Sequence, residues 1–238
     1  SEMCIRDRAI PAFIGYTEKA SRNGKSLNNI PTHISSMLDY HQMFGGSSGL
    51  GDITVNLNAD NSVGKIDSQY TYYLYDSVKL YFDNGGGECY IASVGLFGDE
   101  VTADALATGL SAVEKEDHPT ILLSPDAMLL EKQDQAYSFQ QAMLAQCNSL
   151  QDRVAVLDVF NGNIDRADKD VILDFRNGIG INFLKYGAAY YPWIMSTFSA
   201  NFGFEDVTIL NPEGEEVNLE DIVSCLLYTS DAADDRDS

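Results

Sequence analysis

Polar side chains that could do acid–base or nucleophilic chemistry follow several apolar runs of this sequence. Ser124 and Asp126 come after "TILL", and Asp158 ends "VAVLD". If these runs are parallel strands, their carboxyl ends meet at one edge of a sheet, which is where open α/β sheets bind ligands. The same edge would carry Ser93, Gly95, Pro125, Asn161, Tyr190, Tyr191, Pro192 and Trp193. A hydrolase or a small-ligand-binding domain with its site at the strand carboxyl ends is therefore one interpretation.

A hydrolase needs a nucleophile, a base that activates it and an acid that orients the base. Ser124 and Asp126 could fill two of these roles, but the chain has three histidines and the pattern places none of them nearby. His33 and His41 fall in the first predicted helix, and His118 precedes the strand at its opposite end. The sequence also lacks a G-x-S-x-G nucleophile elbow. We therefore predict no catalytic residues and no enzyme activity, with a hydrolase as the alternative.

The carboxylates at this edge have a structural explanation as well as a chemical one. Asp126 and Asp158 could contribute oxygen ligands to a hard cation. However, Asp126 directly precedes the predicted helix 130–150, where an aspartate commonly caps the first turn. Caps and turns account for these residues better than ligation does, so the sequence predicts neither a metal site nor a cofactor.

The glycines of "YFDNGGGECYIASVG" (81–95) suggest a phosphate loop at first sight. Such a loop needs a strand, then glycines, then a helix whose first amides meet the anion, followed by Lys and Ser or Thr. Here a predicted helix at 70–82 comes first and an apolar strand at 89–95 comes last, with Glu88 directly after the glycines. A carboxylate there would repel phosphate. We predict a tight turn with Gly85 in the left-handed position that ends a helix, and no nucleotide site.

Helical and strand patterns alternate along the rest of the chain. The expected helices cover 101–116, 130–150 and 164–179, and the expected strands lie within 119–127, 152–160 and 186–194. Strands that alternate with helices form parallel sheets covered by helices on both faces and joined by right-handed crossovers. The sequence therefore predicts an α/β fold with at least four parallel strands.

The amino-terminal part has a less regular pattern. A strand is expected at 9–16, followed by a polar loop. A helix is expected from Pro31 to the glycines at 45 and 46, packed through a stripe of Ile34, Met37, Leu38 and His41. "ITVNL" (53–57) predicts an edge strand or a loop excursion.

Composition and charge limit the classes of partner. The chain has 238 residues and a formal net charge of -21, from 36 acidic and 15 basic side chains. Nucleic acids and anionic membranes are bound through basic surfaces, so neither is an expected partner. No apolar run reaches the ~18 residues of a membrane span.

Both ends of the sequence differ in character from its middle. We interpret "SEMCIRDR" (1–8) and the segment 224–238 as adapter-derived tails, which leaves Cys89 and Cys147 as buried reduced thiols. The expected divisions are these tails, an amino-terminal strand, helix and loop region at 9–64, an α/β core domain at 65–194, and the start of a further segment at 195–223.

Five stretches in this order resemble the tail sheath proteins of contractile phage tails and contractile injection systems. They are "AIPAFIGYTEKA", "YFDNGGGECYIASVG", "ALATGLSAVEKEDHPTILLSPDA", "QQAMLAQCNSLQDRVAVLDV" and "KYGAAYYPW". Together they span nearly all of residues 9–194. The resemblance implies a subtilisin-like α/β layering without protease activity, and the chain lacks the Asp, His and Ser signature segments of subtilisins.

The resemblance also implies a role in assembly. Sheath subunits form a helical polymer around an inner tube, contract when a baseplate triggers them, and meet a terminator at the end of the tail. Arms from neighbouring subunits add strands to each other's sheets. The expected location is a virion tail or an injection particle assembled in the bacterial cytoplasm. The amino-terminal arm and the later carboxyl-terminal part of a sheath subunit are not found in the sequence, so we interpret the chain as an amino-terminal and central fragment.

Overall fold

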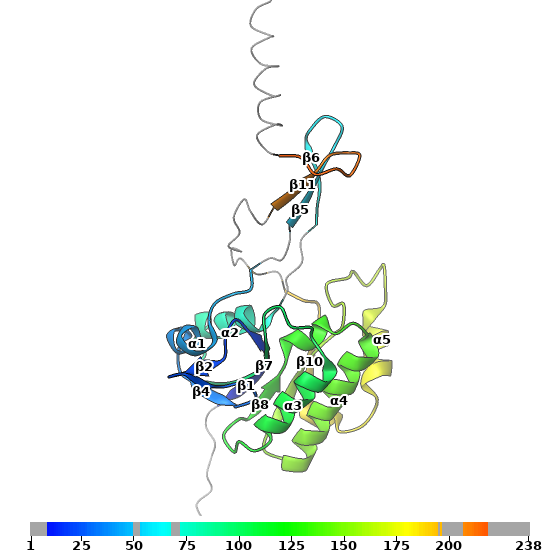
Figure 1. Ribbon diagram of the computed structural model, residues 1–238. Helices are drawn as coiled ribbons and strands as arrows, with labels where there is room; N and C mark the ends of the chain where they lie inside the picture. The colour runs from blue at the N-terminus through cyan, green and yellow to red at the C-terminus, as the bar shows by residue number, and fades with distance from the viewer. Residues whose placement is uncertain (1–8, 50–52, 68–71, 195, 197–206, 219–238) are drawn as a thin grey trace, which may run out of the picture. The chain divides into compact units, whose positions relative to one another are not determined.

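The computed structural model describes residues 9–49, 53–67, 72–194, 196 and 207–218. They belong to two compact units, one made of Ser1–Ser48 with Tyr72–Phe198 and the other of Gly49–Thr71 with Ser199–Ser238 (Figure 1). This grouping crosses the boundaries expected from the sequence, because a strand near residue 55 pairs with one near residue 209. The expected tails at 1–8 and 224–238, with Cys4 and Cys225, lie outside the described residues.

The larger unit contains a six-stranded sheet in the order β10-β9-β8-β1-β7-β4. The strands are β1 (Pro11–Thr17), β4 (Thr32–Ile34), β7 (Cys89–Leu96), β8 (Ile121–Leu123), β9 (Val154–Asp158) and β10 (Gly187–Tyr190). β1 pairs in parallel with β7 and with β8, and β9 and β10 continue the parallel arrangement. β4 pairs antiparallel with β7. The predicted α/β class and its parallel strands are confirmed.

Side chains of the central strand β1 alternate between two hydrophobic cores. Phe13 packs in one core with α1 (Met37–Phe44) and α2 (Leu74–Asp83), whereas Ile14 and Tyr16 pack in the other with α3 (Ala103–Val113) and α4 (Gln133–Leu150). This alternation follows from the two-residue period of a strand. Figure 1 shows α1 beside α2, and α3 beside α4. Helices therefore cover both faces, as predicted.

Local sequence explains where several helices begin. The side chains of Ser36, Thr102 and Asp170 accept hydrogen bonds from amides in the first turns of α1, α3 and α5 (Val171–Ile179). Such caps satisfy amides that lack a partner within the helix. The helix expected at 164–179 is therefore shorter than predicted, since its cap lies at Asp170.

The first helix was predicted too long. Thr32–Ile34 form β4, and α1 begins only at Met37, so His33 lies on a strand and not on a helix. The predicted stripe was also wrong, because Leu38 is 65% exposed. The buried residues of α1 are Tyr40, Met43 and Phe44. Pairing with β7 explains the difference, since a sheet contact outweighs a weak helical period.

The glycine-rich stretch forms the predicted turn. α2 ends at Asp83, Asn84 caps it, and Gly85 has φ +84° before β7 begins at Cys89. Glycine adopts this left-handed conformation without the steric cost that a Cβ brings. A second turn was missed by the sequence analysis: Asn23 and Gly24, both with positive φ, join β2 (Ser21–Arg22) to β3 (Lys25–Ser26). The Asn-Gly pair was the available signal.

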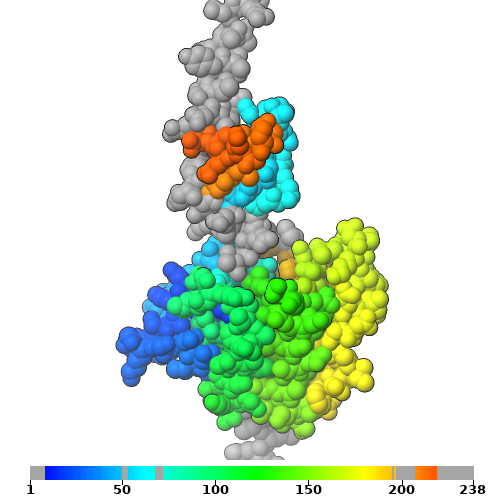
Figure 2. All heavy atoms as spheres, turned by 45° about the vertical axis from the view of Figure 1, so that its right-hand side comes forward, coloured from blue at the N-terminus to red at the C-terminus, as the bar shows by residue number. Residues whose placement is uncertain are grey.

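The second unit contains a three-stranded sheet in the order β11-β5-β6. β5 (Ile53–Leu57) lies between β6 (Val63–Asp67) and β11 (Val207–Leu210), so "ITVNL" is a central strand and not an edge. Figure 2 shows β11, in orange, against the cyan residues of the β5–β6 hairpin. The strand and polar turn expected after residue 204 are confirmed for 207–216.

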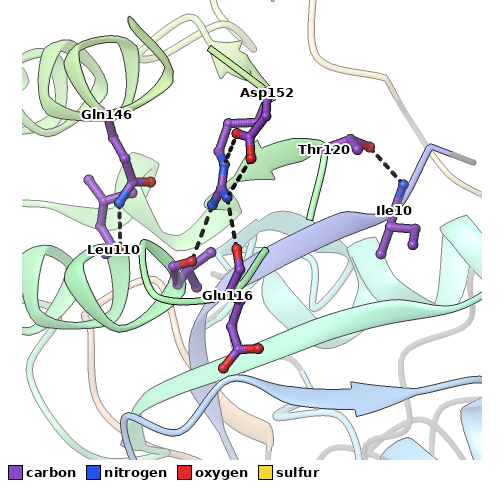
Figure 3. Close-up of polar contacts among 8 residues, drawn as sticks. Ile10, Leu110, Glu116, Thr120, Gln146 and Asp152 are labelled. Atoms are coloured by element: carbon purple, nitrogen blue, oxygen red, sulfur yellow. Dashed lines mark hydrogen bonds and ion pairs between the residues drawn. The ribbon is translucent and has the colours of Figure 1, made fainter. Parts of the chain in front are cut away.

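A buried arginine holds the loops at the amino ends of β8 and β9. Arg153, only 3% exposed, donates to the carbonyl oxygens of Val113 (3.2 Å) and Glu116 (2.8 Å) and pairs with Asp152 (2.8 Å). Figure 3 shows this cluster together with two neighbouring bonds, from Gln146 to the Leu110 carbonyl and from the Ile10 amide to Thr120. The guanidinium fork therefore ties the end of α3 to the start of β9.

Candidate functional site

The structure brings the predicted polar residues to one edge of the sheet. The serine hydroxyl groups there form hydrogen bonds within the fold. Ser124 is 5% exposed and donates to the Ile14 carbonyl at 2.9 Å. The Ser93 hydroxyl lies 2.7 Å from that of Thr17 and also donates to the Gly95 carbonyl. A hydroxyl that donates to a backbone carbonyl lacks the base that would activate it.

The histidines are placed away from Ser124. His33 lies 3.0 Å from Glu88, which directly precedes β7, and His41 reaches the Tyr75 hydroxyl at 3.4 Å. His118 stacks on Tyr90, with 6.4 Å between ring centroids. The described residues therefore contain no serine–histidine pair at this edge.

Asp126 is a fully buried carboxylate that joins three segments. Its Oδ2 accepts the Tyr16 amide at 2.7 Å, and its Oδ1 accepts the amides of Tyr73 (2.6 Å) and Leu74 (3.1 Å). The predicted cap of the helix at 130–150 was therefore wrong, because α4 begins after Lys132 without a side-chain cap, and Asp126 instead accepts amides at the start of α2. Desolvation raises the pKa of Asp126 to about 6, although the three amides act in the opposite direction. Both oxygens are occupied by amides, which leaves poor geometry for a cation.

Gly15 permits this arrangement. A Cβ at residue 15 would collide with the Asp126 carboxylate and would also meet the Cβ of Leu74. The absence of a side chain lets the end of β1 approach both Asp126 and the start of α2 closely. Sequence alone does not reveal this contact, since Gly15 gives no signal other than a glycine within a strand.

Asp158 differs from Asp126 because its carboxylate is unpaired. No hydrogen bond or ion pair reaches this group within the described part of the chain, although Gln140 donates to the Asp158 carbonyl at 2.8 Å. Burial raises the pKa of Asp158 to about 6. Along β9, Ala155 and Leu157 belong to the α3–α4 core, so Asp158 points to the opposite face of the sheet.

The remaining predicted residues shape the edge. Asn161 has φ +56° in the turn after β9, and the Trp193 indole donates to the Val159 carbonyl at 2.9 Å. The Tyr191 hydroxyl donates to the Ile164 carbonyl, whereas Tyr190 is 65% exposed. The segment after β10 is thus fastened to the turn after β9. These are structural roles, and Asp158 is the acidic group at this edge with unused hydrogen-bonding capacity.

Replacing Asp158 with asparagine is expected to stabilise the protein increasingly as pH rises. The folded pKa of about 6 lies above the ordinary 3.8, so the folded state binds the proton more tightly than the unfolded state between these values. Ionisation therefore costs stability as pH rises from about 4 to above 6. Asparagine removes that cost, and partial solvent access limits the gain to about 1–3 kcal/mol at pH 7. Urea unfolding at several pH values measures it.

Asp170→Asn is the matched control with the opposite sign. The Leu173 amide lowers the pKa of Asp170, so this carboxylate stabilises the fold at neutral pH and loses that contribution in acid. A difference between Asp158→Asn and wild type that does not change with pH would contradict the assignment.

No group of three or more His, Cys, Asp and Glu side chains that could hold a metal ion occurs among the described residues. None of the helices described is both long and apolar enough to span a bilayer. Cys89 and Cys147 are buried free thiols, as predicted. A scan against models of protein families matches none of them, and a search of curated proteins finds no significant match.

Proposed function

We propose that the chain is a structural subunit of a contractile tail sheath. The observation that carries the proposal is the ordered set of five sequence stretches that resemble sheath proteins. Each stretch coincides with one unit of the parallel sheet, namely β1, the α2–β7 turn with β7, α3 with β8, α4 with β9, and β10. The resemblance therefore follows the elements that form the core of the α/β unit.

The proposal includes a finer fold assignment, a subtilisin-like layering used without protease chemistry. The occupied Ser124 hydroxyl and the capping role of Asp126 support the second part of this statement. The chain would then act by assembly around an inner tube, with the baseplate and tail terminator as further partners, in a tail or injection particle assembled in the bacterial cytoplasm. Arms exchanged between neighbouring subunits would link them by β-strand addition.

An exposed apolar surface supports an assembly role. Leu173 of α5 is 53% exposed, and the residues Ile181, Phe183 and Leu184 that follow α5 are 89%, 41% and 46% exposed. We call these four residues the α5–η2 patch, since the last of them opens the short helix η2 (Leu184–Tyr186). Large apolar side chains that are exposed within one short stretch of chain are candidates for a protein interface. A subunit that packs against copies of itself would need such a surface.

Negative-stain electron microscopy of the full reading frame, co-expressed with a neighbouring tube gene, tests the proposal. We expect striated tubes or short contracted sleeves, because sheath subunits polymerise around a tube. Ile181→Asp should reduce their number, since a charge at the α5–η2 patch disfavours packing, while Leu38→Asp on α1 provides a control at an exposed leucine outside the patch. Monodisperse monomers in the presence of the tube protein would overturn the proposal.

A further inference from the structure

One face of the six-stranded sheet is covered over only part of its width. On this face, Phe13 of β1 is 2% exposed beneath α1 and α2, whereas Val154 of β9 is 43% exposed and Tyr190 of β10 is 65% exposed. Exposure therefore rises from the centre of the sheet toward the β10 edge. Val156 and Asp158 of β9 are partly exposed on this face. Parallel sheets in α/β proteins are normally covered on both faces, so this incomplete cover needs an explanation.

Strand register identifies the residues of this uncovered region. Val156 pairs with Ala188, and Asp158 pairs with Tyr190, so these four side chains point to the same side. Val154 joins them because it is two residues from Val156 on the same strand. We call this group the open face: Val154, Val156, Asp158, Ala188 and Tyr190. Its opposite side, with Ala155 and Leu157, belongs to the buried α3–α4 core.

The open face combines apolar surface with one unpaired acid. Four of its members are apolar or aromatic, and Asp158 has no hydrogen-bond or ion-pair partner for its carboxylate in the described part of the chain. A half-buried carboxylate on an apolar surface is costly unless a cation pairs with it. The partner that matches this surface best therefore presents an apolar stripe and a positive charge together.

The dimensions of the open face fit a helix. Neighbouring strands lie about 4.8 Å apart and a helix is about 10 Å in diameter, so one helix lying along β9 and β10 would cover both strands. Five residues of β9 extend over about 16 Å, the length of about three helical turns. The other half of the same sheet face is already covered by helices, because α2 contributes Leu74 and Val78 to the core that contains Phe13.

Charge favours a basic partner for the open face. The chain carries a formal net charge of -21, which attracts a basic partner, and the Asp158 carboxylate offers a lysine or arginine of that partner a site for pairing. We propose that the open face binds an amphipathic helix of another protein, with a lysine or arginine of that helix paired with Asp158. This inference does not rest on the proposed sheath function.

A synthetic peptide of leucine and lysine, about 14 residues long and with leucines on one helical face, is the probe. We expect the complete chain to bind the peptide in fluorescence anisotropy at physiological salt. Val154→Asp places a charge on the apolar stripe and should weaken binding by at least about tenfold. Asp158→Asn should weaken binding about three- to tenfold, because the ion pair is lost while the shape is kept. Tyr190→Asp is the second disruptive variant, since this exposed side chain tolerates substitution.

Three controls separate the open face from general attraction between charges. A peptide of the same composition in scrambled order should bind at least about tenfold more weakly, because it lacks an apolar face. Leu38→Asp and Asp104→Asn alter an exposed leucine and an exposed acid elsewhere, and should leave affinity unchanged. Circular dichroism verifies the fold of each variant.

Several results would overturn the proposal. One is equal affinity for the ordered and the scrambled peptide. Another is an equal loss of peptide affinity in Val154→Asp and Leu38→Asp. A third is self-association of the chain in light scattering that Val154→Asp abolishes, since a second copy would then occupy the open face.

Discussion

Replacing Arg153 with alanine is expected to lower the free energy of unfolding by about 3–5 kcal/mol, one of the two largest effects anticipated for this protein. The side chain is 3% exposed and donates to the carbonyl oxygens of Val113 and Glu116 while pairing with Asp152. Alanine would remove the donor to the Glu116 carbonyl, leave the Val113 carbonyl with only the Glu116 amide, and open a void beneath both. Denaturant unfolding followed by circular dichroism measures the change.

Two further variants separate geometry from charge. Arg153→Lys keeps the charge but lacks the planar fork, so it should lose about 1–3 kcal/mol. Arg166→Ala removes an exposed arginine whose Asp170 partner is also exposed, and should change stability by less than about 0.5 kcal/mol. If Arg153→Ala were no more destabilising than Arg166→Ala, the buried cluster would not hold the loops together.

The second large effect is expected at Asp126. Alanine at this position would remove the acceptor of three backbone amides, those of Tyr16, Tyr73 and Leu74. Each buried amide left without a partner costs about 1–3 kcal/mol, and some water entry is expected, so the total loss should be about 3–5 kcal/mol. Thermal and denaturant unfolding of the variant test this value.

Asparagine at position 126 provides the graded comparison. Its single carbonyl oxygen can accept on one side, but its NH₂ group would face amide donors on the other, so an intermediate loss of about 2 kcal/mol is expected. Asp170→Ala removes an exposed cap of α5 and should destabilise the fold much less than Asp126→Ala does. A loss at Asp126→Ala no larger than at Asp170→Ala would show that Asp126 is not the central cap inferred from the structure.

The parallel sheet could be predicted because its signals are local. Continuous apolar runs such as 89–95, separated by amphipathic helices, specify buried parallel strands with little ambiguity. The turn at Gly85 was predictable for the same reason, since a glycine after a helix has one dominant explanation. Boundaries were less certain: a cap such as Asp170 fixes the start of α5, but several acids in that region could have served.

The errors came from contacts between distant segments. His33 was assigned to a helix because only the nearby sequence was considered, while its strand conformation comes from pairing with β7. β5 became a central strand through pairing with β11, which lies far along the chain. Tertiary pairing of this kind overrides local propensity.

The candidate site was predicted in position but not in function. Sequence alone placed Ser124, Asp126 and Asp158 at the strand carboxyl ends, yet it could not show which of them were occupied. Ser124 donates to the Ile14 carbonyl, and Asp126 accepts three amides, one of them from Tyr16. Ser124 and Asp126 each reach β1 across a sequence separation of 110 residues. Of these three side chains, only that of Asp158 has no partner among the described residues. This difference depends on side-chain direction and packing.

The central position of β1 has a consequence during synthesis of the chain. β1 is translated before β7 and β8, the two strands that flank it, and its side chains supply both cores. The hydrogen bond from the Tyr16 amide to Asp126 can form only after a further 110 residues have been made. A seven-residue apolar segment thus remains unpaired while the intervening chain is made. Such long-range closure slows folding and exposes the segment to aggregation. We therefore expect the nascent protein, until residues near 126 have emerged from the ribosome, to be a client for chaperones that shield apolar strands.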